Sequence, residues 1–178
     1  MSSILRWSMT AVMALGLISG ASAASLDKAA PQDPIARQVR HELIMIPQLT
    51  VFDNLSYRVE GGTVILTGEV RNGFIKDEAM ARIKSIAGVE KIENRIEVLP
   101  ASFNDDRIRR EEAAAIFGYT ALSRYSWGVV PSIRIIVKNG NVSLEGVVDS
   151  KMDKNIAGIR ANDVLGVFSV QNNLVVER

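Results

Sequence analysis

GTVILTGEV (residues 62–70) and GNVSLEGVV (residues 140–148) are the two stretches that decide the fold, because both read G-x-V-x-L-x-G-x-V at an offset of 78 positions. The same offset pairs Lys76 with Lys154 and Asn94 with Asn172 without a gap. A register kept over this length indicates that one structural unit was duplicated. A period this long, present only twice, predicts two small domains rather than a solenoid.

The first unit alternates between helical and strand patterns. Asp33 followed by Pro34 predicts a helix start, and Pro47 is expected to end that helix. Period-two alternation on both sides of Gly61-Gly62 predicts a hairpin, after which a second helical stripe and a last alternating strand follow. The apolar positions that carry these patterns are Ile35, Val39, Leu43 and Ile46; Tyr57, Val59, Val64, Leu66 and Val70; Ile75, Ala79, Ile83 and Ile86; and Ile92, Ile96 and Val98.

The second unit repeats this order. A helix is expected to open at residues 104–106, a hairpin to turn at Asn139-Gly140, and glycines to cap the later helix of each unit, Gly88 in the first and Gly166 in the second. The order α-β-β-α-β predicts an α+β fold in which a three-stranded sheet carries two helices on one face. The apolar positions are Ile108, Ala115, Ile116 and Leu122; Ile133, Ile135, Val137, Val142, Leu144 and Val148; Ile156, Ile159 and Val164; and Val170, Leu174 and Val176.

The first residues have the composition of a targeting segment. Arg6 is the only charged residue before Asp27, an apolar run covers residues 9–18, and Ala21-Ser22-Ala23 follows. A charged start, a short apolar stretch and an A-x-A site predict a secretory signal peptide that is cleaved near Ala23. The run is too short for a stable membrane span, and an uncleaved amphipathic anchor is the alternative. Because no cysteine follows the run, a bacterial lipoprotein is not expected.

The mature chain predicted in this way is electrically neutral. Cleavage removes Arg6 from the 21 Lys and Arg residues, which leaves 20 to balance the 20 acidic residues. A neutral protein lacks the basic surface that follows a phosphate backbone, which argues against nucleic acid and against purely electrostatic membrane binding. The chain has no cysteine, so thiol catalysis and cysteine zinc sites are excluded. Packing alone must therefore hold two domains of about 70 residues each.

Patterns that carry chemistry are few. His41 is the only histidine and lies on the polar side of the first helix, where one histidine cannot build a metal site. No G-x-S-x-G elbow for a catalytic serine is present. Gly61-Gly62 and Asn139-Gly140 lie inside hairpins and lack a following Lys-Ser/Thr, so they predict turns rather than phosphate-binding loops. We therefore expect no enzymatic activity, no metal, no cofactor and no small-molecule substrate.

Arginines gather at the start of the second unit. Arg107, Arg109 and Arg110 lie among acidic residues, which favours ion pairing on a solvated helix and leaves contact with a lipid headgroup as the alternative. The acidic residues are Asp105, Asp106, Glu111 and Glu112.

The second unit inserts SRYSWGVVP (residues 123–131) where the first has residues 48–54, with Phe52 as the one aromatic. Aromatic side chains with a polar tip favour interfaces and membrane surfaces. Arg124, Tyr125 and Trp127 are therefore the candidate residues for contact with lipid or a partner. The alternative interpretation is that they cover the end of the second core.

The element order, the twofold hairpin motif and the Gly-Val pair before each last strand resemble the BON domain family. The second hairpin, VKNGNVSLEGVV (residues 137–148), is particularly close to that pattern, and the resemblance covers residues 34–178. With a signal peptide and two copies, the chain resembles the exported OsmY-like osmotically inducible proteins. The resemblance implies a mixed sheet in each domain and glycines that serve the fold rather than binding, namely Gly62, Gly68, Gly88, Gly140, Gly146 and Gly166.

The same resemblance implies a non-enzymatic envelope protein, either periplasmic or secreted. Members of the family are thought to associate with phospholipid or envelope proteins under osmotic or envelope stress, and some act as periplasmic chaperones. We expect membrane or envelope association, with a chaperone or scaffold for protein clients as the alternative. The predicted limits are a signal peptide at 1–23, a flexible mature N-terminus at 24–33, domains at 34–100 and 105–178, and a linker at 101–104.

Overall fold

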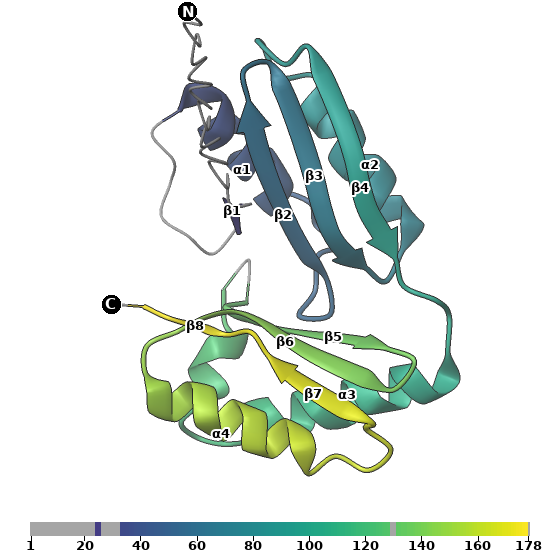
Figure 1. The fold of residues 1–178 in the computed structure, drawn as a ribbon, viewed down its shortest axis with the longest axis vertical. Coiled ribbons are helices and arrows are strands. Elements are labelled where there is room, and N and C mark those ends of the chain that lie inside the picture. Colours follow the sequence, from purple (N-terminus) through teal and green to yellow (C-terminus); the bar gives the residue numbers. More distant parts are fainter. Residues whose placement is uncertain (1–23, 26–32, 129–130, 178) are drawn as a thin grey trace, which may run out of the picture.

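Two α+β domains follow one another in the computed structural model, which describes residues 24–25, 33–128 and 131–177 (Figure 1). The predicted signal peptide and most of the predicted mature N-terminus lie outside the described residues. Domain 1 comprises β1 (Ala24–Ser25), α1 (Pro34–Ile44), β2 (Asn54–Glu60), β3 (Thr63–Val70), α2 (Gly73–Lys84) and β4 (Lys91–Val98). Domain 2 comprises α3 (Phe103–Phe117), the 3-10 helix η1 (Ser123–Ser126), β5 (Ile133–Lys138), β6 (Asn141–Val148), α4 (Lys151–Asn162), β7 (Ser169–Asn172) and β8 (Val175–Val176).

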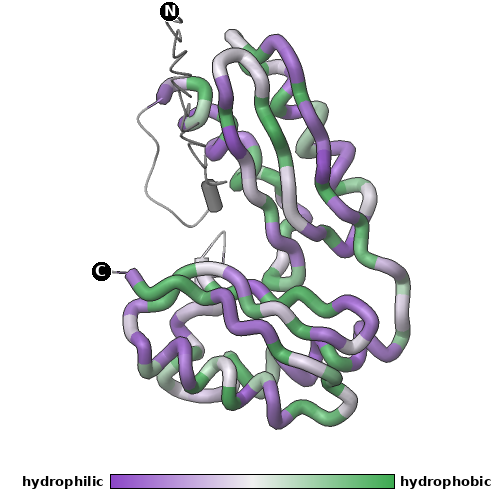
Figure 2. The backbone as a smooth tube through the Cα atoms, in the orientation of Figure 1, coloured by the Kyte–Doolittle hydropathy of each residue, from purple (hydrophilic) through white to green (hydrophobic). Residues whose placement is uncertain are grey.

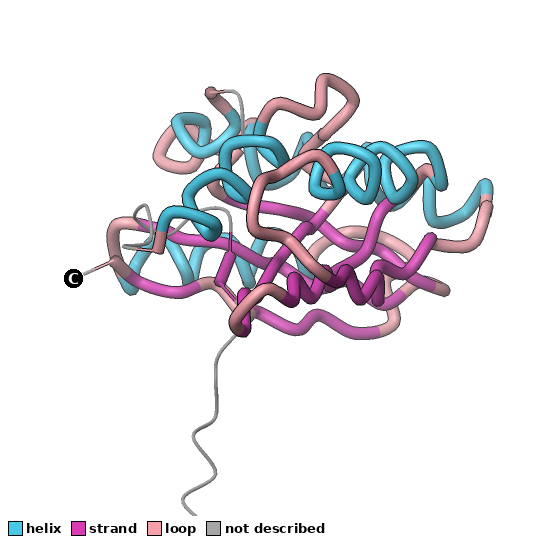
Figure 3. Tube along the Cα trace, turned by 90° about the horizontal axis from the view of Figure 1, so that it is seen from above, coloured by secondary structure: helices cyan, strands magenta, loops and turns pink. Residues whose placement is uncertain are grey.

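Each domain is a mixed sheet with its helices on one face, which confirms the predicted fold class (Figure 1, Figure 3). In domain 1 the sheet order is β1-β2-β3-β4, with β2 and β3 antiparallel and β3 and β4 parallel. The short β1 adds to the outer edge of β2. In domain 2, β5 and β6 are antiparallel, while β7 and β8 both run parallel to β6 and act as one interrupted third strand.

A side-chain cap begins each of the four α-helices in the described residues. Asp33, Asn72, Ser102 and Ser150 each accept a hydrogen bond from a backbone N–H of the first turn. Such a cap satisfies one of the donors that a helix start leaves unpaired and contributes about 1 kcal/mol. The caps therefore set where each helix begins and, through it, where the sheet-facing residues lie.

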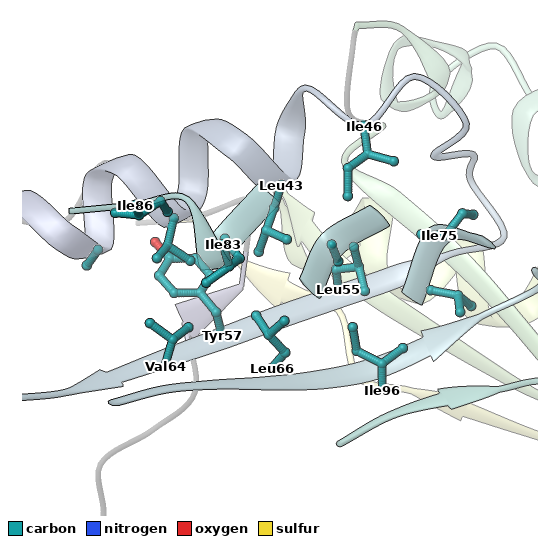
Figure 4. Packing of buried hydrophobic residues seen from close by; sticks show 14 residues of the cluster. Leu43, Ile46, Leu55, Tyr57, Val64, Leu66, Ile75, Ile83, Ile86 and Ile96 are labelled. Atoms are coloured by element: carbon teal, nitrogen blue, oxygen red, sulfur yellow. The ribbon is translucent and has the colours of Figure 1, made fainter. Parts of the chain in front are cut away.

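Each domain buries its own apolar core between the sheet and the helices. In domain 1, Leu43 of α1 and Ile83 of α2 pack over Tyr57 and Leu66 of the hairpin (Figure 4). Domain 2 has the corresponding cluster around Ile108 and Ile116 of α3, strands β5 and β6, and two alanines of α4. The alternation of apolar and polar residues that produces these cores is visible along the strands in Figure 2.

One residue of the predicted helical stripes lies on the wrong side. Ile159 was expected to face the core, but α4 buries Asp153, Ala157 and Ala161 and leaves Ile159 exposed. Small residues on the inner face let α4 lie close to the sheet, so the larger isoleucine points to solvent.

The glycines after α2 and α4 lie in turns rather than at the helix caps that the sequence predicted. The C-caps are Ser85 and Asp163, and Gly88 (φ +89°) and Gly166 (φ +86°) follow three residues later. Between each helix and its glycine, backbone N–H groups donate hydrogen bonds to carbonyls three residues earlier, so the chain continues in tight turns. The left-handed backbone is therefore needed where the chain turns into the last strand.

Close backbone packing also requires glycine within the hairpins. Gly68 has a φ of +116°, and a Cβ atom at this position would collide with the carbonyl oxygen of Asn54 on β2. Gly146 takes a matching φ of +114° in domain 2. The two hairpin turns differ, because Asn139 (φ +52°) and Gly140 (φ +76°) are both left-handed, whereas Gly61 alone has this conformation in the turn of domain 1.

The two domains contact each other through the loop that precedes β2. Phe52 packs against the core of domain 2, and the Val51 carbonyl accepts a hydrogen bond of 2.7 Å from the N–H of Ile135 in β5. The buried carboxylate of Asp53 shapes this loop by accepting hydrogen bonds from the Thr50 N–H and hydroxyl, at 3.0 and 2.7 Å. The loop thus pairs with one backbone N–H on the edge of β5 and joins the domains.

Candidate functional site

Tyr125 fastens the inserted loop of domain 2 to the body of the domain. Its side chain is buried, and its hydroxyl donates to the Asp153 carboxylate at 3.0 Å while accepting from the Asp149 N–H at 2.9 Å. The hydroxyl of Ser150, the cap of α4, donates to the same carboxylate oxygen at 2.7 Å. Burial raises the pKa of Tyr125, so the phenol keeps the proton that it donates. Tyr125 therefore covers the end of the second core.

Arg124 clamps this anchor from the solvent side. Its guanidinium donates to the Tyr125 hydroxyl at 2.8 Å, to Asp153 at 3.0 Å and to Asp149 at 3.1 Å. The guanidinium carbon also lies 4.6 Å from the centre of the Tyr125 ring. Because two carboxylates balance its charge, Arg124 offers little unpaired positive charge to an anionic surface.

Trp127 is held out into solvent two residues after the anchor. Its side chain is 76% exposed, and the backbone leaves η1 in an extended conformation at this residue. Met152 is 70% exposed and lies in the first turn of α4, between the two aspartates that Arg124 contacts. Two large apolar side chains are thus displayed at one end of domain 2 beside a hydrogen-bonded anchor, and neither contributes to the core.

The corresponding loop of domain 1 is used differently. It is shorter, and its aromatic residue, Phe52, packs against domain 2. The guanidinium carbon of Arg71 lies 5.5 Å from the centre of the Phe52 ring, within the range of a cation–π contact. The two copies have therefore diverged at this loop, one toward contact between the domains and the other toward solvent.

The charged cluster on α3 is only partly solvated. Arg107 forms the predicted ion pair with Glu111, at 2.7 Å. Arg109 also forms an ion pair of the predicted kind, with Asp106 at 2.7 Å, but it is buried and donates to the Val137 carbonyl at 2.6 Å. The carboxylate of Asp105 is buried under the β5–β6 turn, where it accepts the N–H groups of residues 139 and 140 at 2.8 and 2.9 Å. The interpretation of a solvated face is therefore wrong for Arg109 and Asp105.

Glu112 differs most from the predicted solvated face of α3. The carboxyl group is fully buried, and neither oxygen has a hydrogen-bond partner. Burial raises its pKa to about 8, so the group stays protonated at neutral pH. The buried residues Arg109, Glu112 and Ile116 have the spacing that α1 gives to three apolar residues, Ala36, Val39 and Leu43. Domain 2 therefore carries charge-bearing side chains at core positions of the repeat.

Sequence reasoning placed Arg124, Tyr125 and Trp127 in one loop but missed Asp149 and Asp153, which hold that loop. A signal for Asp153 was available, because S-x-x-D at residues 150–153 has the form of a capping box at a helix start. Ile159 was assigned to the core stripe of its helix and Met152 was not assigned a role, but both are exposed on α4. Trp127 is the most exposed of the three candidates, because Tyr125 is buried and Arg124 is half exposed and paired with two carboxylates.

No cluster of metal-binding side chains is found in the described part of the chain. No group of three or more His, Cys, Asp or Glu side chains is close enough there to hold a metal ion, and His41 is exposed on α1. A groove of about 510 Å³ lies on domain 1 between α2 and the start of β4, with Met80 and Ile92 among its lining residues. None of the described helices is long and apolar enough to cross a bilayer.

Comparison with known proteins identifies one family. The family described as the BON domain matches residues 31–100 and 120–178. The comparison with curated proteins finds no match. Among solved structures, the C-terminal domain of CdsD, described as the structural protein of the type III secretion system of Chlamydia trachomatis, is 12% identical with a TM-score of 0.32, over 78% of this chain and 96% of that one. A second CdsD structure is 13% identical with a TM-score of 0.30, over 77% and 91% of the two chains.

Proposed function

Because the chain belongs to the BON domain family, we propose that it is a non-enzymatic protein that associates with phospholipid membranes or other envelope components. We place it in the periplasm or the external medium, where such association protects the envelope during osmotic or other stress. The contact is assigned to the end of domain 2 that displays Trp127 and Met152.

The observation that carries this proposal is the exposure of Trp127 beside a fixed anchor. Because Trp127 is 76% exposed, its indole ring leaves apolar surface in contact with water, which is unfavourable. Tryptophan combines an apolar ring with an N–H donor and therefore favours the boundary between lipid headgroups and acyl chains. Since Tyr125 already holds the loop in place through Asp153, little ordering of the chain is needed when Trp127 enters that boundary.

The charge of the protein favours insertion over electrostatic attraction. The predicted mature chain is neutral, and the one arginine of the loop is paired with two carboxylates. Binding that depends on apolar burial is little affected by salt, whereas binding through basic residues is screened as salt rises. The proposal therefore specifies association that persists at high ionic strength.

Co-sedimentation of residues 24–178 with vesicles tests the proposal. Zwitterionic and anionic vesicles are compared at two salt concentrations, with Trp127→Ala as the test variant. Phe74→Ala is the matched control, because Phe74 is an exposed aromatic residue at the start of α2 in domain 1. We expect binding that survives high salt, weakens in Trp127→Ala and is unchanged in Phe74→Ala. Failure of the unsubstituted protein to bind either vesicle contradicts the proposal.

The second candidate function is holding of protein clients. It is favoured by the neutral charge and by the groove between α2 and β4, whose lining combines Met80, Val89 and Ile92 with charged residues. An extended client segment could lie along such a groove beside an edge strand. This candidate predicts suppression of client aggregation by residues 24–178 in the absence of lipid, together with loss of that activity on Met80→Glu.

A further inference from the structure

The other end of α4 displays a second group of apolar side chains. Leu165 and Phe168, in the connection from α4 to β7, are 82% and 78% exposed. Phe103, the first residue of α3, is 97% exposed. Phe103 lies one helical turn before Arg107 on the same face of α3, and Arg107 reaches Leu165. We call Phe103, Leu165 and Phe168 the distal tip; its connecting loop lies at the lower right of domain 2 in Figure 1.

Hydrogen bonds, together with the packing of Val164 and Val167 against the core, hold the distal tip in shape. The Arg107 guanidinium donates to the Leu165 carbonyl from two nitrogens, both at 3.2 Å, and to the Asn104 side chain at 3.1 Å. The N–H of Phe168 donates to the Gly140 carbonyl at 2.8 Å. The Phe168 ring lies so close to Gly140 that a Cβ atom there would be 2.6 Å from it. The backbone is therefore fixed while the apolar side chains point outward.

Domain 1 shows that the fold does not require these side chains. At the offset of 78, Leu165 corresponds to Ala87, and Phe168 corresponds to Glu90. Glu90 lies against Gly62 at the equivalent hairpin turn. The same loop of the repeat thus carries a small residue and a charged residue in one copy, and two large apolar residues in the other. Core packing cannot account for that difference, because all four side chains are exposed.

The character of the distal tip favours a lipid surface as its occupant. Side chains exposed to this extent protrude and need no preformed pocket, because acyl chains can rearrange around them. Residues 164–168 carry no charge, and Arg110, three residues after Arg107 on α3, is exposed and can face phosphate groups. Arg107 itself is paired with Glu111 and holds the loop at Leu165. Exposed apolar side chains together with an exposed arginine match the chemistry of a bilayer surface, in which acyl chains lie beneath phosphate groups.

We propose that the distal tip enters the boundary between the headgroups and acyl chains of a phospholipid bilayer, as a second contact beside that of Trp127. This inference rests on the proposed function and specifies the part of domain 2 that enters the bilayer. The two contacts lie at opposite ends of α4, whose 12 residues span about 18 Å. Each contact adds apolar burial to the association, so we expect removal of either to weaken it.

Paired substitutions with a matched control test this inference on residues 24–178. The test variant combines Leu165→Ala with Phe168→Ser, and the control combines Met45→Ala with Phe74→Ser on domain 1, where both residues are exposed. Affinity for zwitterionic vesicles should fall about tenfold or more in the test variant, because partial burial of two large apolar side chains exceeds the 1.4 kcal/mol of a tenfold change. The control should bind like the unsubstituted protein. Circular dichroism confirms that both variants are folded.

A fluorescent reporter keeps the test independent of the stability of that variant. Phe168→Trp in a Trp127→Phe background places the only tryptophan of residues 24–178 at the distal tip. We expect a blue-shifted emission and quenching by brominated lipid when vesicles are added. If the unsubstituted protein binds vesicles but this reporter does not respond, or if the paired variant binds as tightly, the inference is overturned and the proposed function stands. If the unsubstituted protein binds no vesicle, both are overturned.

Discussion

Asn94 and Asn172, which lie 78 positions apart, make the same two contacts in their respective domains. The side-chain amide of Asn94 donates to the Lys76 carbonyl of α2 at 3.5 Å, and its oxygen accepts the Ile96 N–H at 3.1 Å. Asn172 donates to the Lys154 carbonyl of α4 at 2.7 Å and accepts the N–H of residue 174 at 3.3 Å. Each asparagine thus ties the last strand to the helix before it and satisfies a donor on an open sheet edge.

Substitution of Asn172 by alanine should expose that edge. We expect the free energy of unfolding to fall by about 1 kcal/mol, since a strand N–H and a helix carbonyl lose their partner. Aggregation should increase, because unpaired edge groups invite pairing with another chain. Urea unfolding and light scattering measure the two effects, and Asn155→Ala on the exposed face of α4 is the control. Equal behaviour of the two variants would rule out a special role for Asn172.

Removal of the Tyr125 hydroxyl should affect stability, in contrast to changes at Trp127. Tyr125→Phe deprives Asp153, Arg124 and the Asp149 N–H of a partner. We expect the free energy of unfolding to fall by about 1–3 kcal/mol, because a buried carboxylate is left with fewer hydrogen bonds. Trp127→Phe should leave it within about 0.5 kcal/mol of the original, as is usual for exposed positions. Denaturant unfolding measures the stability of Tyr125→Phe and Trp127→Phe. Equal stability of the two variants would contradict the role of Tyr125 as the anchor of the loop.

Glu112 should make the protein less stable as the pH rises. Its pKa is about 8 in the folded protein against an ordinary value of 4.5, so the folded chain keeps a proton that the unfolded chain loses between these values. The free energy of unfolding therefore falls with increasing pH across this window, by up to about 1.4 kcal/mol per pH unit, and levels off above it. Urea unfolding at a series of pH values between 4.5 and 9 measures this slope.

Two variants identify Glu112 as the origin of that slope. Glu112→Gln cannot ionise, so the stability of this variant should change much less between pH 5 and pH 8. Glu111→Gln is the control, because Glu111 is exposed and pairs with Arg107 at the surface. An undiminished slope in Glu112→Gln would show that another group is responsible.

Phe52→Ala should loosen the contact between the domains. The ring is the apolar group of domain 1 that packs against the core of domain 2, and a Lys138–Glu97 ion pair of 2.6 Å is exposed to solvent and adds little. We expect calorimetric unfolding to broaden or separate into two transitions, since each domain has its own core. Phe74→Ala, which removes an exposed aromatic residue of domain 1, should preserve the original profile. A single, unchanged unfolding transition in Phe52→Ala would contradict the claim that Phe52 couples the two domains.

The repeat predicted most of the fold, because the spacing of Val64, Leu66 and Val142, Leu144 reports which strand residues face the core beneath the helices. It could not predict the buried charges of α3, because apolar periodicity gives no sign that a carboxyl group occupies a core position. The partners of Asp105 are the N–H groups of residues 139 and 140, far along the chain, and appear only once the turn lies over the helix.

The candidate site was predicted in part for a similar reason. An insertion relative to the other copy pointed to Trp127, but sequence cannot distinguish an aromatic residue that anchors a loop from one that is displayed by it. Tyr125 is the anchor because its hydroxyl reaches Asp153, which is brought near by the start of α4. Leu165 and Phe168 could have been noticed from their replacement of Ala87 and Glu90, although their exposure follows only from the structure.

Fluorescence of Trp127 during titration with phospholipid vesicles tests the central claim most directly. The sequence has two tryptophans, of which Trp7 lies in the predicted signal peptide, so Trp127 is the sole tryptophan of residues 24–178. The account predicts a blue-shifted emission at high salt, with quenching by lipids brominated near the headgroup. An unchanged emission at lipid concentrations that saturate co-sedimentation, or no co-sedimentation at all, would contradict it.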